Sequence, residues 1–117
     1  MNKLLAALVC ALTASAVSAA TYDVSITGPG GHSNGSYGNT NAVHAGSRAV
    51  LELEKALPCA VVTDFKGGAT VNAIAGDAAF KVNTAMCKTP EADNKASIEQ
   101  AAKTGVDKEN AFRGVKA

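Results

Sequence analysis

The sequence lacks most of the residues that build a large hydrophobic core. It has no tryptophan, only two tyrosines and three phenylalanines, and three prolines among 117 residues. A chain this short with so few bulky side chains forms one small domain with a thin core. Its formal net charge is only +1, so it also lacks the basic surface that nucleic-acid binding requires, and we expect no nucleic-acid partner.

A hydrophobic run long enough to span a bilayer is also missing, since a transmembrane helix needs about 20 apolar residues. The longest apolar run, residues 4–12, follows Lys3 and precedes small residues, with Val17 and Ala19 placed three and one before a candidate cut. This pattern is typical of a secretory signal peptide over residues 1–19, cleaved after Ala19 or Ala20. We therefore predict a periplasmic or secreted protein with no membrane attachment after cleavage. The alternative is an uncleaved anchor.

Cleavage at this point changes the composition of the chain. Removing 19 of 117 residues leaves 98, with ten basic and ten acidic side chains, and 18 of the 41 remaining apolar residues are alanine. A core of this kind is thin and its stability marginal. Two cysteines remain, Cys59 and Cys87. An even number of cysteines in an oxidising compartment predicts one disulfide, with reactive thiols as the alternative.

Apolar periodicity predicts the element order β-α-β-β-α, because the strands alternate with period two and the helices carry stripes with period 3.6. The predicted elements are a strand over 22–27, a glycine-rich loop over 28–38, a helix over 39–56, strands over 59–65 and 77–86, and a helix over 90–103. Asn39 or Thr40 is the expected N-cap of the first helix, and Gly105 the expected stop of the second.

This order predicts an α+β fold, a ferredoxin-like β-α-β-β-α two-layer sandwich whose last strand is short or missing. The predicted domain covers residues 20–105, and residues 106–117 are a C-terminal tail or a residual fourth strand. If the second and third strands pair antiparallel about residues 71–73, Cys59 lies opposite Cys87. A bridge closing a loop of this size stabilises by about 3–4 kcal/mol on chain-entropy grounds.

Three polar features of the first half carry less specific signals. Arg48 and Glu52 are spaced for an i,i+4 ion pair on the first helix. His44 is on the solvated face of the same helix, and no role is predicted for it. Residues 28–31 have the glycine content of a phosphate-binding loop, but no Lys-Ser/Thr follows them, which disfavours that interpretation.

Two segments resemble a known family. In GPGGHSNGSYGNTNAVHAGSRAV a strand ends in Gly-Gly-His-Ser before a glycine-rich loop and a helix. FKGGATVNAIAGDAAFKVN contains Gly-Gly, then Val-Asn-Ala-Ile, then a strand. Together, over residues 22–83, they resemble the dimerisation (lid) domain of the zinc metallopeptidases that include aminoacylases, glutamate carboxypeptidases, carnosine dipeptidases and succinyl-diaminopimelate desuccinylases.

The resemblance implies roles for two residues. His32 matches the family histidine that reaches into the partner subunit's active site and helps bind the developing oxyanion. Asn72 matches the asparagine that helps hold the substrate carboxylate. The family arginine that shares this second role falls in residues 83–85, which contain no arginine, and Ala75 stands where the family has proline. The substrate-binding half of the family site is therefore incomplete in this sequence.

The family's metal chemistry is not expected in this chain. In the family it resides in a separate catalytic domain that holds two zinc ions. Here the only histidines are His32 and His44, and neither has an aspartate two residues later. We therefore expect no metal, no other cofactor, and no enzymatic activity from this chain on its own.

Three functions follow as hypotheses. The first is an exported, non-catalytic, free-standing dimerisation domain that forms a homodimer or docks onto a metallopeptidase catalytic domain. The second is the lid subunit of a split zinc-dependent peptidase or amidohydrolase, contributing His32 in trans. The third is a small-ligand-binding ferredoxin-like module, for which fold analogy is the only support. A truncated or degenerate gene product is a further alternative.

Overall fold

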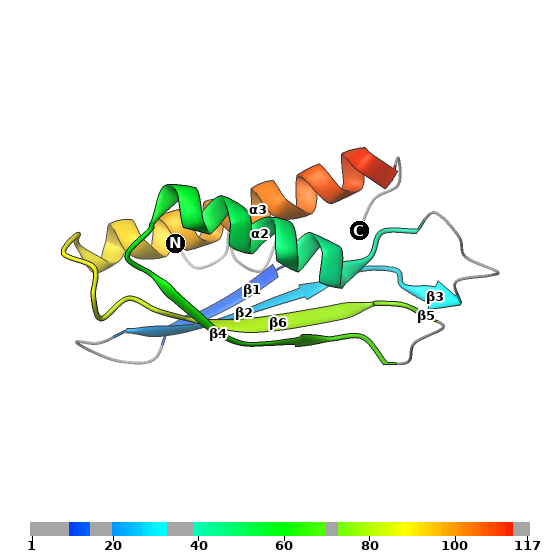
Figure 1. Ribbon diagram of the computed structural model, residues 1–117, viewed down its shortest axis with the longest axis horizontal. Helices are drawn as coiled ribbons and strands as arrows, with labels where there is room; N and C mark the ends of the chain where they lie inside the picture. Colours follow the sequence, from blue (N-terminus) through cyan, green and yellow to red (C-terminus); the bar gives the residue numbers. More distant parts are fainter. Residues whose placement is uncertain (1–9, 15–19, 33–38, 70–72, 114–117) are drawn as a thin grey trace.

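Two helices cover one face of a four-stranded antiparallel sheet (Figure 1). The computed structural model describes residues 10–14, 20–32, 39–69 and 73–113. The elements are β1 (Cys10–Ala14), β2 (Thr21–Thr27), β3 (Gly31–His32), α2 (Ala42–Ala56), β4 (Val61–Gly67), β5 (Ala73–Ile74), β6 (Asp77–Asn83) and α3 (Glu91–Arg113). The main sheet has the order β1-β2-β6-β4, and β3 pairs separately with β5.

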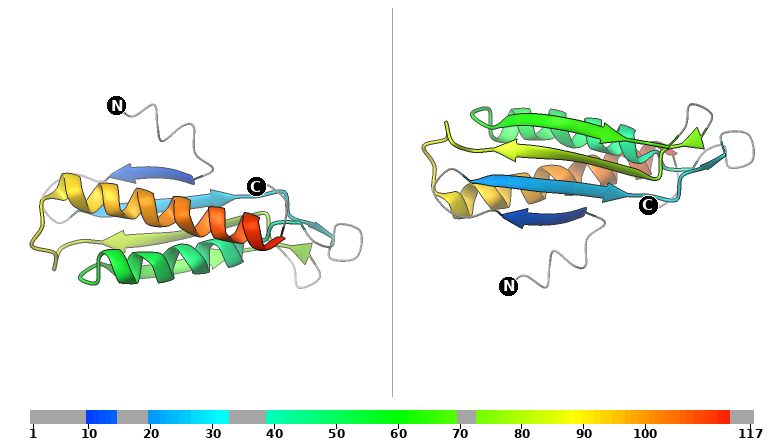
Figure 2. Two further views of the ribbon diagram at one scale, coloured as in Figure 1. Left: turned by 90° about the horizontal axis from the view of Figure 1, so that it is seen from above. Right: turned by 90° about the horizontal axis from the view of Figure 1, so that it is seen from below.

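The predicted ferredoxin-like sandwich is confirmed. Strand β6 pairs antiparallel with both β2 and β4 and lies between them, so α2 connects two parallel strands that are not neighbours. Seen from above and below in Figure 2, α3 lies toward the β1 side of the sheet and α2 toward the β4 side. The opposite face of the sheet has no helix over it in the described part of the chain.

The core lies between the sheet and the helices and consists mainly of small side chains. The residues predicted to share one face of β2, Tyr22, Val24 and Ile26, are all buried. The buried apolar residues of the two helices are Ala42, Ala45, Ala49 and Leu53 of α2 and Ile98, Ala101, Ala102 and Val106 of α3. Five of these eight residues are alanine, in line with the thin, alanine-weighted core that the composition predicted.

Helix α2 begins later than predicted, and its N-cap is Asn41 rather than Asn39 or Thr40. The Asn41 side chain accepts hydrogen bonds from the backbone N–H groups of Val43 (2.9 Å) and His44 (3.1 Å), which satisfies two donors at the helix end. The two preceding residues make tertiary contacts instead. Asn39 donates to the Gly30 carbonyl and the buried Thr40 hydroxyl donates to Asn110.

The predicted end of the second helix at Gly105 is wrong. Helix α3 continues through Gly105 to Arg113, so residues 106–113 are helical rather than a fourth strand. A Cβ placed on Gly105 would lie 2.4 Å from the backbone N and 2.6 Å from the Cα of Ala49 on α2. Glycine is therefore needed here for the close approach of two helices, and this packing outweighs its low helix propensity. Residues 114–117 lie outside the described residues.

Strands β4 and β6 pair as predicted, but their register differs. Val62 lies opposite Val82, whereas the register that places Cys59 opposite Cys87 would place it opposite Thr84. This shift of two residues keeps the side chains of residues 61–63 on their predicted faces, but from Lys66, which lies opposite Ala79, the shift is one residue. The ladder has a β-bulge between Thr63 and Lys66, and β5 leaves the predicted hairpin to pair with β3. These two departures from a simple hairpin account for the shift.

Part of the predicted signal peptide forms the outer strand of the sheet. Strand β1 pairs antiparallel with β2, with Cys10 opposite Ile26 and Ala14 opposite Tyr22. It takes the position beside β2 that the strand after the second helix takes in a ferredoxin-like fold. Residues 1–9 and 15–19 lie outside the described residues, and cleavage after Ala19 or Ala20 stays a prediction.

The helix crossing gives a direct test of this packing. We expect Gly105→Ala to lower the free energy of unfolding by about 1–3 kcal/mol, the usual range for overpacking, although alanine is the better helix former. Gly76→Ala is the matched control, because its new Cβ would meet its nearest neighbour, the Gly28 carbonyl oxygen, at 3.5 Å. Urea denaturation measures both. An unchanged or raised stability for Gly105→Ala would contradict the described crossing.

Candidate functional site

His32 lies at one end of the molecule, on the small β3–β5 sheet beyond the main sheet (Figure 1). Its backbone pairs with Ala73, while the residue itself is exposed. The preceding Gly30 adopts a φ of +57°, and a Cβ there would lie 2.9 Å from the Cα of Gly76. The glycine-rich turn thus fixes the backbone before His32 and leaves the imidazole available to a partner.

Of the other positions that the family resemblance singled out, Ala75 directly follows β5, the strand that pairs with β3, whereas residues 83–85 do not lie near His32. Asn72 lies outside the described residues. The segment 83–85, which takes the place of the family arginine, follows the far end of β6, because Asn83 pairs with Thr21 while Asp77 pairs with Thr27 near β3. Six residue steps along a strand span roughly 20 Å. Of the two proposed site residues, His32 and Asn72, only His32 is among the described residues.

A shallow apolar groove runs between α2 and the edge strand β4. It has a volume of about 460 Å³, and we call it the α2–β4 groove; its lining residues are Ser47, Val50, Leu51, Val62 and Phe65. Leu51 is 57% exposed, and Phe65 and the neighbouring Val61 are exposed large hydrophobic residues as well. Exposed apolar side chains that cluster beside an open sheet edge are typical of a protein interaction surface.

The β-bulge shapes the floor of this groove. Asp64 adopts a φ of +56°, in the left-handed region, at the bulge between Thr63 and Lys66. The ring of Phe65 stacks on Phe80 with centroids 5.7 Å apart, and it also lies against α2, because a Cβ on Gly46 would come within 3.0 Å of it. The Phe65 ring thus contacts the core residue Phe80 and also lines the groove. The bulge has no clear signal in the sequence.

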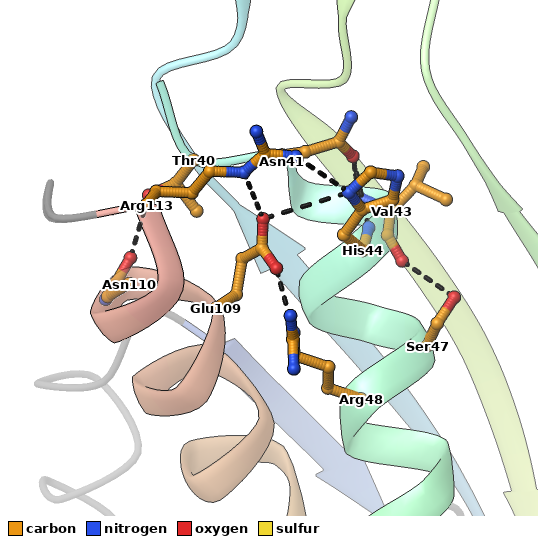
Figure 3. Close-up of polar contacts among 9 residues, drawn as sticks. All are labelled: Thr40, Asn41, Val43, His44, Ser47, Arg48, Glu109, Asn110 and Arg113. Atoms are coloured by element: carbon orange, nitrogen blue, oxygen red, sulfur yellow. Dashed lines mark hydrogen bonds and ion pairs between the residues drawn. The ribbon is translucent and has the colours of Figure 1, made fainter. Parts of the chain in front are cut away.

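A buried carboxylate joins the start of α2 to the end of α3 (Figure 3). The Glu109 side chain has no exposed surface. It accepts hydrogen bonds from Arg48 Nε on one oxygen and Arg113 Nε on the other, both at 2.9 Å. His44 lies 3.9 Å from the same carboxylate and 3.1 Å from the Arg113 guanidinium. Both arginines also pack over the exposed ring of Phe112.

The charge of Glu109 is maintained by these partners. Burial raises the pKa of the Glu109 carboxyl, but the hydrogen bonds from Arg113 and Arg48 outweigh it, and the net pKa is lower than usual. Removing either arginine would leave this buried carboxylate without a partner, which would destabilise the folded state. The cluster therefore holds the two helices in one arrangement and occupies Arg48, His44 and Glu109 in structural contacts.

This cluster was not predicted from the sequence. The predicted Arg48–Glu52 pair is wrong, since Arg48 bonds to Glu109 while Glu52 pairs with Lys55 and Lys108. His44, for which no role was predicted, contacts Arg113. The signal that could have revealed the cluster is the i,i+4 spacing of Glu109 and Arg113. Both residues lie beyond Gly105, where the helix was predicted to end.

The opposite end of the molecule contains the predicted disulfide and a second polar cluster. Cys59 and Cys87 are bonded, with their Cα atoms 5.1 Å apart. Nearby, the carboxylate of Glu91 accepts hydrogen bonds from Tyr22 (2.8 Å) and Thr84 (2.6 Å). Burial and the neighbouring Glu91 raise the pKa of Tyr22 to about 12. The Thr84 and Tyr22 hydrogen bonds lower the pKa of Glu91 despite its burial.

Neither a metal centre nor a membrane span is found among the described residues. No group of three or more His, Cys, Asp and Glu side chains in residues 10–14, 20–32, 39–69 and 73–113 could hold a metal ion. Within the same residues, no helix combines the length and apolar character needed to cross a bilayer. His32 and the α2–β4 groove are two features that this part of the chain offers to a partner.

Comparison with known proteins agrees with the fold and the sequence motifs. The profile of the peptidase dimerisation domain family matches residues 15–111. No curated protein matches the chain significantly by sequence.

Solved structures share the fold of this chain. A hydantoinase/carbamoylase family amidase from Burkholderia ambifaria is 29% identical, with a TM-score of 0.54, and the match covers 80% of this chain and 24% of that one. Aminobenzoyl-glutamate utilization protein from Klebsiella pneumoniae is 20% identical over 80% of this chain and 25% of that one, with a TM-score of 0.52. AtUAH in complex with (S)-hydroxyglycine is 20% identical, with a TM-score of 0.55 and coverage of 95% and 28%. The chain thus spans about a quarter of each.

The Glu109 cluster predicts an acid-sensitive stability. A carboxyl with a lowered pKa in the folded state stabilises fully above its unfolded pKa, and this contribution is lost as pH falls through the folded pKa. We expect Glu109→Gln to lower the free energy of unfolding at pH 7 by about 1–3 kcal/mol. Denaturant titrations between pH 7 and pH 3 should show a smaller acid-dependent loss in this variant than in the parent chain.

The control for this experiment is Glu54→Gln, at an exposed position on α2. It should leave both the stability at pH 7 and its pH dependence close to those of the parent chain. If Glu109→Gln retained the full acid-dependent loss, Glu109 would not be a source of it.

Proposed function

The chain belongs to the peptidase dimerisation domain family, and from this premise we propose that it is an exported, non-catalytic association module that pairs with a second copy of itself through β4 and α2. The α2–β4 groove carries the proposal. It presents Leu51 and Phe65 to solvent beside a sheet edge. A catalytic domain of the metallopeptidase type is the second candidate partner for the same surface.

The backbone of β4 supports pairing at this edge. The backbone N–H and C=O groups of Lys81 and Asn83 in β6 face β4, because the neighbouring Thr84 donates its N–H to Ala20 on the β2 side. Their partners Val61 and Thr63 therefore hydrogen-bond to β6. Val62 directs its N–H and C=O away from β6, toward the open edge. Two β4 strands related by a two-fold axis could pair antiparallel here and continue the sheet across both copies.

The bulge limits this backbone contribution. Regular pairing of β4 with β6 is interrupted between Thr63 and Lys66, and bulges weaken an edge as a template for another strand. The apolar contact between two α2 helices must therefore supply much of the binding free energy. Leu51 lies on the exposed surface of α2 and is the natural centre of such a contact.

The proposal assigns no catalytic role to this chain. The chain spans about a quarter of the length of each related structure. It also contains no candidate metal cluster among its described residues. The activities named for those proteins are therefore not assigned to this chain.

Export is proposed from the N-terminal pattern of residues 1–19 and from the disulfide, which persists in oxidising compartments. Of the two predicted cuts, after Ala19 or after Ala20, we propose the first, and the contacts of Ala20 support it. Ala20 is buried, and its carbonyl accepts hydrogen bonds from the backbone N–H and the hydroxyl of Thr84. Cleavage after Ala19 would retain both bonds.

Leu51→Asp tests the association surface. A charge at this exposed position should leave the fold intact but oppose burial in an interface. We therefore expect the dissociation constant of the dimer, measured by sedimentation equilibrium, to rise at least tenfold. Met86→Asp is the control, because Met86 is also exposed, at 73%, but lies away from the groove. A parent chain that is monomeric at high concentration, or a Leu51→Asp dimer of parental strength, would refute self-association through this surface.

The exposed position of His32 favours one second candidate, the lid of a split zinc-dependent hydrolase. Its backbone is fixed by pairing with Ala73 while the residue is exposed, as a group acting in a partner's site requires. With a separately encoded catalytic half added, His32→Ala should lower kcat at least 100-fold without weakening assembly. His44→Ala should retain activity. Equal activity of the His32→Ala and parent assemblies would eliminate this candidate.

A further inference from the structure

We propose that the outer edge of β2 is a strand-binding site whose resident ligand is the chain's own segment Cys10–Ala14, and that loss of the N-terminal segment opens it. Pairing of this segment with β2 is independent of the α2–β4 groove. Only the opening by cleavage rests on the proposed export. The ligand class is an extended, uncharged peptide that runs antiparallel to β2.

Two hydrogen bonds at the ends of β2 establish which of its backbone groups face this edge. Thr84 N–H donates to the Ala20 carbonyl, and Gly28 N–H donates to the Gly76 carbonyl. In an antiparallel strand, successive residues direct their N–H and C=O groups to opposite sides. The even-numbered residues of β2 therefore bond to β6. The odd-numbered residues, including Asp23 and Ser25, direct their backbone groups toward β1.

The register then defines the contacts of the segment. Asp23 lies opposite Thr13 and Ser25 opposite Ala11, so these pairs exchange the N–H···O=C bonds between the strands. Leu12 lies opposite Val24, and its backbone N–H points away from β2. A backbone change at Ala11 or Thr13 therefore disrupts pairing, whereas the same change at Leu12 does not.

Strand β2 has the properties of a good strand acceptor. Its pairing with β6 is regular over all seven residues, whereas the other edge strand, β4, is bulged. Without β1, the outward N–H and C=O groups of a regular strand would lie open along the sheet edge, which is the arrangement that binds extended peptides. Val24 and Ile26 are each 1% exposed, so the strand itself is firmly held in the core.

The segment in turn suits this edge. Cys10–Ala14 has the sequence CALTA, without charge, proline or glycine, and so nothing in it opposes an extended conformation. It covers β2 from Tyr22 to Ile26. In the uncleaved chain the ligand and its site are joined by a short connection, which raises the effective concentration of the ligand.

Amide hydrogen exchange in the full chain, made without export machinery so that residues 1–19 remain, tests the proposal. We expect Thr13→Pro to speed exchange at the Asp23 and Ser25 amides at least tenfold while leaving those of Val24 and Ile26, which bond to β6, unchanged. Leu12→Pro is the control, because the N–H it removes points outward. Equal exchange at Asp23 and Ser25 in the Thr13→Pro, Leu12→Pro and parent chains would overturn the proposal.

A second measurement uses the chain 20–117 and a synthetic peptide of residues 8–16 with Cys10→Ser. The unmodified peptide and one N-methylated at Leu12 should restore protection of Asp23 and Ser25, whereas one N-methylated at Ala11 and Thr13 should not. Protection in the full chain that depends on protein concentration would overturn the proposal, because a second copy would then cover the edge. The association of Thr13→Pro chains through the α2–β4 groove should be unchanged, which separates this result from the dimer test.

Discussion

The close crossing of α2 and α3 at Gly105 is the contact on which the rest of the molecule depends. Since a Cβ there would lie 2.4 Å from the backbone of Ala49, the two helices meet almost backbone to backbone. This short distance lets an alanine-rich layer cover the sheet without large side chains. It also brings Glu109 of α3 within hydrogen-bond distance of Arg48 of α2. The thin core and the buried ion cluster are thus two results of one packing contact.

Local patterns in the sequence were sufficient for the order of the five longest elements, β2, α2, β4, β6 and α3, for the buried face of β2 and for the disulfide between Cys59 and Cys87. Each of these depends on periodicity or on residues with few possible partners. The prediction failed where tertiary contacts decided the outcome. Gly105 has the same local signal in a helix stop and in a helix crossing, and only the presence of Ala49 distinguishes them. The Glu109 cluster was lost with it, because half of its residues lie beyond that glycine.

The candidate site was predicted in part, for a similar reason. A motif could point to His32, but no motif describes a surface assembled from two elements, such as Leu51 of α2 with Phe65 of β4. Phe65 of the groove directly follows Asp64 at the bulge, where an aspartate takes a backbone conformation that favours glycine. Family resemblance and physical reasoning are complementary here. The first identified the domain, and the second located the surface through which such a domain can associate.

The two ends of the molecule are held together by different chemistry. Beside the start of α3 the sheet is tied by the Cys59–Cys87 bond and the Glu91 cluster, and beside the end of α3 the helices are tied by Glu109 and two arginines. A reducing agent therefore acts only on the end far from His32, whereas acid acts on both ends, because it protonates Glu91 at one end and Glu109 at the other. Reduction can thus loosen one end of the domain and leave the other intact, and acid cannot.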